Sequence, residues 1–262
     1  MKRALIIIQG LLMMVLAVFI VSFLYTLITY LFMYVTGLSV LSSDIEYCLM
    51  VMAIMISCIL LYVWYKKYMS HRRGELIDLK EVFSIKNVLL YLMLGIGCQL
   101  FISGVLSLLR PLFERVFSYY DETMTSIFDA DIIIVAAYVI VFAPLFEEFL
   151  MRGILYNRLR YGISFPLANF IQALAFGIYH LDIVQGIYAF AIGLILGYLY
   201  EKTRTLLAPI FLHMVINGLG FLIQLLALGK YLTIGVAIIV GGILLFGSLY
   251  MYGKNNKYII KK

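Results

Sequence analysis

The chain has 262 residues and a formal net charge of +6; 65% of the residues are hydrophobic, 13% are charged, and the mean hydropathy is +1.05. Soluble domains are about 45–50% apolar and about 25% charged, so this composition excludes a soluble globular enzyme, and the abundance of aromatic residues excludes a disordered chain. The remaining class is an all-α, polytopic membrane helix bundle, with residues 1–262 forming a single integral membrane domain. The basic residues occur in short clusters between apolar runs, a pattern typical of membrane topology and not of nucleic-acid binding.

Hydropathy predicts about eight transmembrane helices, because a spanning helix needs about 20 mostly apolar residues. The predicted spans are residues 4–35, 46–66, 87–109, 131–159, 165–182, 184–200, 206–228 and 231–252. Between the third and fourth spans, residues 110–130 mix charges with aromatic residues, which indicates an interfacial helix or loop. We expect the three cysteines to be apolar core residues without disulfides; they are Cys48, Cys58 and Cys98.

Basic and acidic connections alternate along the chain. The basic ones contain Lys2, Arg3, Lys66, Lys67, Arg72, Arg73, Lys80, Lys86, Arg152, Arg158, Arg160, Lys202, Arg204, Lys254, Lys257, Lys261 and Lys262. The acidic ones contain Asp44, Glu46, Asp121, Glu122, Asp129, Asp131 and Asp182, and only Lys230 follows the seventh span. By the positive-inside rule this alternation supports an even number of spans and places both termini in the cytoplasm.

Few ionisable residues lie inside the predicted spans, and each is costly to bury in a membrane, so they are candidates for function. They are Glu147, Glu148 and Arg152 in the fourth span, His180 in the fifth, and His213, accompanied by Asn217, in the seventh.

Helical spacing suggests a role for each of these residues. Glu148 and Arg152 are four residues apart and can form an ion pair, which leaves Glu147, turned about 100° away, available for chemistry. His213 and Asn217 have the same spacing, as do Phe176 and His180.

Depth in the membrane limits which of these residues can cooperate. With a rise of about 1.5 Å per residue, Glu147 lies about 20 Å from the cytoplasmic end of its span, His180 about 24 Å, Asn217 about 16 Å and His213 about 10 Å. The spread of roughly 14 Å permits a shared site only if the helices tilt.

A carboxylate and an imidazole in a low-dielectric cavity can remove a proton from a water that attacks a carbonyl. A second imidazole and an amide can stabilise the oxyanion that forms. No Ser or Cys stands at matching spacing near the histidines, so direct attack by water is favoured over a covalent intermediate. Glu147, His180 and His213 could alternatively bind a divalent metal such as zinc.

Three short motifs of this chain resemble those of a known protein family. EEFLMR (147–152), FGIYH (176–180) and HMVIN (213–217), in this order in three spans, resemble the motif set of the CPBP intramembrane proteases, also called the Abi or type II CAAX prenyl endopeptidase family. The resemblance covers residues 131–220, the core carrying the motifs. It implies that Glu147 activates water with His180, that His213 and Asn217 stabilise the oxyanion, and that Glu148, Arg152 and Phe176 support the site.

The sequence therefore predicts an intramembrane endopeptidase, acting in peptide maturation, in bacteriocin-related processing or on CAAX-type tails. One alternative is a non-catalytic scaffold or immunity protein that binds a peptide or membrane partner, and another is a proton-coupled carrier. The composition favours a multi-pass protein of a bacterial plasma membrane. The expected partners are membrane lipid and a peptide or protein substrate, and no sequence feature indicates an oligomeric state.

Overall fold

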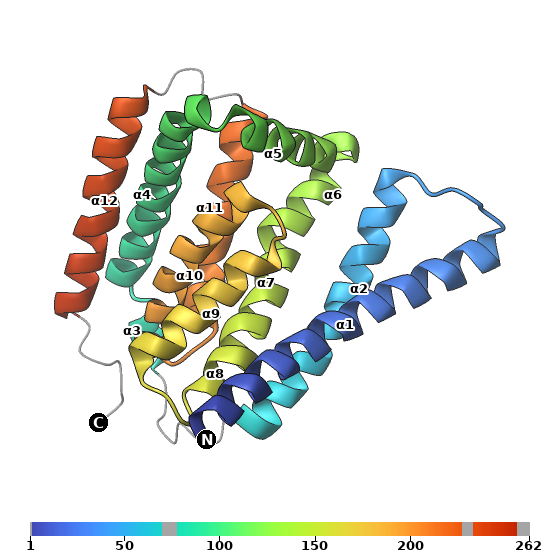
Figure 1. The fold of residues 1–262 in the computed structure, drawn as a ribbon, viewed down its shortest axis with the longest axis horizontal. Coiled ribbons are helices and arrows are strands. Elements are labelled where there is room, and N and C mark those ends of the chain that lie inside the picture. Colours follow the sequence, from blue (N-terminus) through green and yellow to red (C-terminus); the bar gives the residue numbers. More distant parts are fainter. Residues whose placement is uncertain (1, 70–77, 227–232, 256–262) are drawn as a thin grey trace. The chain divides into compact units, whose positions relative to one another are not determined.

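The computed structural model describes residues 2–69, 78–226 and 233–255, and within them it contains helices and no strand (Figure 1). Seven of these helices are long and apolar enough to cross a membrane, and an eighth apolar helix, Phe165–Tyr179, is shorter. The prediction of an all-α polytopic bundle is confirmed, and the chain is a multi-pass membrane protein.

The described residues divide into two compact units. The first comprises the described residues within 1–72 and 123–172, and the second comprises those within 73–122 and 173–262. The three motifs are therefore distributed over both units, with the two glutamates in the first and both histidines in the second.

The first unit begins with α1 (Lys2–Thr36) and α2 (Ser43–Trp64), which continues into a π-helical turn, η1 (Tyr65–Met69). The predicted fourth span is one continuous helical rod, made of α6 (Ile132–Ala137), η5 (Tyr138–Phe142), α7 (Ala143–Glu148), η6 (Phe149–Tyr156) and α8 (Asn157–Leu159).

The second unit contains α3 (Leu79–Val82), α4 (Ile85–Leu109), η3 (Arg110–Leu112), α10 (Ile183–Thr203), α11 (Leu207–Leu225) and α12 (Ile234–Asn255). Two helices cross the boundary between the units: α5 (Glu114–Ser126), which is followed by η4 (Ile127–Asp129), and α9 (Phe165–Tyr179). Helix α5 confirms the helical alternative for residues 110–130.

Helix α1 is packed along only part of its length. Near its start, a Cβ placed on Gly10 would lie 3.1 Å from Leu155 Cδ1, and Arg158 hydrogen-bonds Gln9. The last buried residue of α1 is Val21. With 35 residues the helix is about 52 Å long, so it must tilt to span a hydrocarbon core of about 30 Å.

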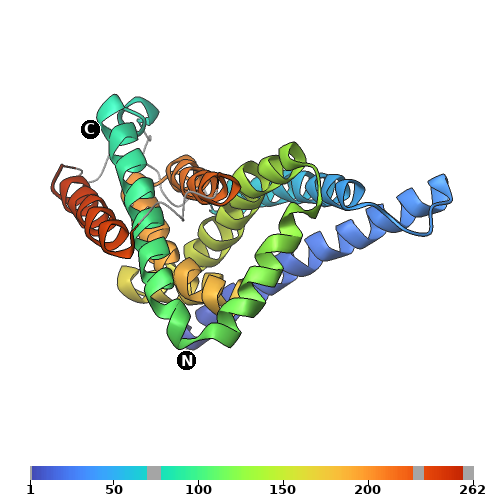
Figure 2. The same cartoon turned by 90° about the horizontal axis from the view of Figure 1, so that it is seen from above.

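In the second unit, α4 and α12 lie side by side (Figures 1 and 2). A Cβ added to Gly97 would lie 2.4 Å from the backbone nitrogen of Leu245, and one added to Gly241 would lie 2.4 Å from that of Phe101. Lipid tails are as apolar as leucine, so membrane helices associate through such close backbone contact.

The basic residues Arg72, Arg73, Lys230, Lys257, Lys261 and Lys262 lie outside the described residues, and the cytoplasmic location of both termini stays a prediction. Cys58 and Cys98 are buried as expected, but Cys48 is exposed, because the segment of α2 that carries it is packed on one side only.

Candidate functional site

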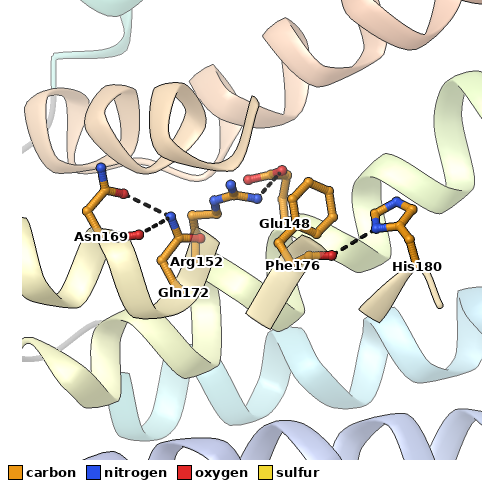
Figure 3. A network of polar contacts seen from close by, with 6 residues as sticks. All are labelled: Glu148, Arg152, Asn169, Gln172, Phe176 and His180. Carbon is orange, nitrogen blue, oxygen red and sulfur yellow. Dashed lines mark hydrogen bonds and ion pairs between the residues drawn. The ribbon is translucent and has the colours of Figure 1, made fainter. Parts of the chain in front are cut away.

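The first unit contains an ion pair that is completely buried. Arg152 Nη1 donates to Glu148 Oε1 at 2.7 Å, and both side chains are 0% exposed (Figure 3). The pair predicted from their spacing is therefore confirmed. Burying an isolated charge would cost several kcal/mol, so each residue makes the burial of the other tolerable.

Glu147 differs from its neighbour as the spacing predicts. Its side chain is half-buried, whereas Glu148 is buried. The Glu147 carboxylate lies within electrostatic range of the Arg152 guanidinium and of the Tyr138 hydroxyl. A carboxylate that keeps part of its surface accessible can reach a water or a substrate, which Glu148 cannot do while it is enclosed with Arg152.

Helix α7, which carries both glutamates, lies between two π-helical segments that the α-helical prediction for residues 131–159 missed. Pro144 has no N–H, so the carbonyl of Ile140 loses its α-helical donor. Directly before the proline, the N–H of Ala143 donates to the Tyr138 carbonyl, five residues earlier, which is the π-helical pattern of η5. Such widened turns occur frequently at functional sites.

Two buried amides of the first unit were missed by the sequence analysis. Gln172 is 0% exposed and Asn169 is 7% exposed. Gln172 Nε2 donates to Asn169 Oδ1 at 2.8 Å and to the Asn169 carbonyl at 3.0 Å (Figure 3). Their spacing of three residues inside an apolar span was the signal that could have identified them.

In the second unit, one aromatic ring contacts both imidazoles. The Phe176 ring centroid lies 4.8 Å from that of His180 and 5.7 Å from that of His213, both in edge-to-face geometry. Two rings that share this neighbour cannot be roughly 14 Å apart, so the depths counted for His180 and His213 were wrong. The count assumed upright helices of full length, whereas α9 has only 15 residues.

The orientation of His180 is determined by its backbone contact. Its Nδ1 lies 2.8 Å from the Phe176 carbonyl oxygen, which can only accept a hydrogen bond, so Nδ1 carries the proton (Figure 3). In the neutral ring, Nε2 then has the free lone pair of a general base or a metal ligand. His213 is 4% exposed, and Asn217 follows it by one helical turn on α11 and is half-buried.

The segment around His180 is held by close helix packing and by a helix cap. A Cβ on Gly177 would lie 2.6 Å from the Gly186 carbonyl oxygen, so α9 and α10 contact each other through their backbones. The Asp182 side chain accepts from Gln185 N at 2.7 Å and caps α10. Between them, Leu181 has φ +56°, a left-handed conformation that ends the predicted span earlier than residue 182.

Helix α5 contributes one more aromatic residue near this turn. The Tyr120 ring packs edge-to-face on Tyr188 of α10 at 6.4 Å. Burial, and after it the neighbouring Asp182 and Asp121 carboxylates, raise the pKa of Tyr120, so its hydroxyl stays protonated at neutral pH.

The structure thus assembles two polar groups: Glu148 with Arg152 in the first unit, and His180 and His213 around Phe176 in the second. That Glu147 acts together with the histidines stays a prediction. So does a metal held by Glu147, His180 and His213; among the described residues no three His, Cys, Asp or Glu form a metal-binding cluster.

Comparisons with known proteins agree with the motifs. Residues 129–219 match the family described as Type II CAAX prenyl endopeptidase Rce1-like. Over 89 residues, 34% of this chain, the sequence is 32% identical to the Bacillus subtilis (strain 168) protein named "Putative membrane peptidase YdiL", of which it covers 36%. No solved structure matches the chain significantly. The resemblance drawn from the three motifs is confirmed, because residues 129–219 are similar to the Rce1-like, CPBP-type family.

Proposed function

We propose that the chain is an intramembrane endopeptidase that hydrolyses a peptide bond by direct attack of water. Glu147 and His180 remove the proton from the water, and His213 with Asn217 stabilises the oxyanion of the tetrahedral intermediate. The observation that carries the proposal is the match over residues 129–219, within which all motif residues are present.

The local geometry supports these roles. His180 has Nε2 available as a base because Nδ1 is bound to the Phe176 carbonyl. His213 is buried, so a hydrogen bond from it to an oxyanion would act with little competition from water. The Glu148 charge is compensated by Arg152, which leaves Glu147 as the carboxylate that can take up a proton.

A bound divalent ion such as zinc is compatible with the same residues. One carboxylate and two imidazoles are a donor set that zinc accepts, and the His180 Nδ1 contact is of the kind that orients metal-binding histidines. When bound, the ion would lower the pKa of the attacking water.

The substrate that we propose is a peptide precursor, such as a bacteriocin or a signalling peptide, with a CAAX-type tail as the alternative. Comparative peptidomics of membranes from cells with the normal chain and with Glu147→Gln would test this. We expect an uncleaved precursor to accumulate in the variant and its product to fall at least about 100-fold, the contribution typical of a general base.

Glu114→Gln, which removes an exposed carboxylate from α5, is the matched control and should process normally. Unchanged peptide pools in Glu147→Gln, with a preserved phenotype, would favour a non-catalytic scaffold or immunity protein. Uptake that depends on the proton gradient, without a cleaved product, would favour a carrier.

A further inference from the structure

The first unit has an apolar groove between α1 and α2. It is open on one side, has a volume of about 550 Å³, and its lining includes Leu31, Phe32 and Val35 of α1 and Asp44, Cys48 and Met52 of α2. Asp44 is the only ionisable carboxylate among the described lining residues, and it stands at the start of α2.

The groove exists because the two helices diverge toward their connection (Figure 1). Beyond Val21, α1 has no buried residue, so its second half contacts α2 on one side only. The six residues 37–42 between the helices begin with Gly37, whose φ of +70° turns the chain out of α1. The helices therefore stay apart at this end.

Asp44 lines the groove where α2 begins, and three further carboxylates lie near this end of α2 without lining the groove; together we call these four the acidic rim. The Asp44 carboxylate accepts a hydrogen bond from the Asp131 backbone nitrogen at 2.6 Å. Asp129 and Glu46 both lie within electrostatic range of Tyr47. All four carboxylates, those of Asp44, Glu46, Asp129 and Asp131, are exposed.

Little positive charge offsets this rim within the described part of the first unit. The basic residues there belong to the start of α1, to the far end of α2 and to residues 152–160, where Arg152 pairs with Glu148. The N-termini of α2 and α6 each contribute about half a positive charge, which is small against four carboxylates.

We infer that this groove binds an apolar peptide segment that is followed by one or more basic residues. The apolar lining alone does not distinguish a peptide from a lipid, because a lipid tail is as apolar as a leucine side chain. The acidic rim does distinguish them, because it attracts Lys or Arg and repels the phosphate of a lipid headgroup. That the bound peptide is the substrate rests on the proposed function, whereas its binding does not.

Cys48 provides a native reporter, because it lines the groove and is exposed, whereas Cys58 and Cys98 are buried. The full chain carrying Glu147→Gln, which prevents turnover, would be placed in phosphatidylcholine vesicles and labelled with a maleimide. The probe is a leucine–alanine peptide that ends in three lysines, and its counterpart ends in three glutamates.

We expect the lysine peptide to slow labelling of Cys48 by about tenfold at ten times its Kd, and the glutamate peptide to leave the rate unchanged. Asp44→Asn combined with Glu46→Gln should abolish the protection, and so should high salt. Glu114→Gln should retain it.

A second pair of variants tests whether the peptide binds in the groove. Leu31→Trp should fill the groove and prevent protection of Cys48, while Leu16→Trp, at a similarly exposed position of α1, should not. Equal protection by both peptides would overturn the inference in favour of any apolar chain, including a lipid tail, and no protection would overturn it outright. If the lysine peptide protects but no precursor accumulates in Glu147→Gln cells, the proposed function fails and the groove stands.

Discussion

The buried ion pair of the first unit and the two histidines of the second unit are kept in the membrane by different means. In the first unit a charged carboxylate is buried by pairing it with a guanidinium, since Glu148 and Arg152 are both 0% exposed. In the second unit two imidazoles, which can be neutral, are positioned by an aromatic ring and a backbone carbonyl. Burial of the first group therefore requires charge compensation, whereas the orientation of the two imidazoles depends on the packing around them. Mutations should affect the two groups differently.

The largest effect on stability is expected from Arg152→Met. It leaves the Glu148 carboxylate buried without its guanidinium, which costs about 3–5 kcal/mol. The detergent-solubilised variant should lose its monodisperse peak in size-exclusion chromatography at a much lower temperature than the normal protein.

The double variant Arg152→Met with Glu148→Gln removes both charges together. It should recover most of the lost thermal stability, because a neutral amide is far less costly to bury than a carboxylate. A double variant as unstable as Arg152→Met would show that packing, and not charge compensation, is the main role of this pair.

The next largest loss of stability is expected where α9 packs against α10 in the second unit. Gly177→Val places side-chain atoms where a Cβ alone would be 2.6 Å from the Gly186 carbonyl oxygen, and we expect a loss of about 1–3 kcal/mol. Gly247→Val on α12, where nothing lies within 4 Å of an added Cβ, is the control. Equal thermal shifts for both variants would contradict the close contact between α9 and α10.

Phe176→Leu should cost about 1 kcal/mol, because it keeps most of the buried volume but removes two edge-to-face contacts. Its effect on processing should exceed its effect on stability, since both imidazoles lose the ring that positions them. Thermal unfolding and the amount of cleaved product would be measured on the same preparations. A variant with normal processing would show that this ring is not needed to orient the histidines.

The smallest effect should be stabilising. Leu181 has φ +56° and a side chain that is 90% exposed, so Leu181→Gly should raise stability by about 0.5–1 kcal/mol. Arg204→Gly is the comparison, because Arg204 is the other described non-glycine residue with positive φ, and it is paired with Glu201. Its gain should be smaller, and a melting temperature of Leu181→Gly below that of the normal chain would argue against backbone strain.

Local sequence patterns predicted much of this structure. Apolar runs located the spanning helices, and spacings of four residues predicted the Glu148–Arg152 ion pair and the contact between Phe176 and His180. The contact between Phe176 and His213 could not be predicted in this way, because it joins residues 37 positions apart and depends on how α9 and α11 tilt. Spacing also assumed regular α-helix, whereas α7 lies between two π-helical segments, and only the first of them, η5, lies next to the backbone donor that Pro144 lacks.

The central proposal is that Glu147 and His180 act in one reaction. The most direct measurement is the rate of precursor cleavage by Glu147→Gln, His180→Gln and the double variant, with each protein present at equal amounts in the membrane. We predict that each single variant loses at least about 100-fold and that the double variant loses no more, as groups that act as a unit do. Losses that multiply in the double variant, or a single variant that cleaves at the normal rate, would contradict the account.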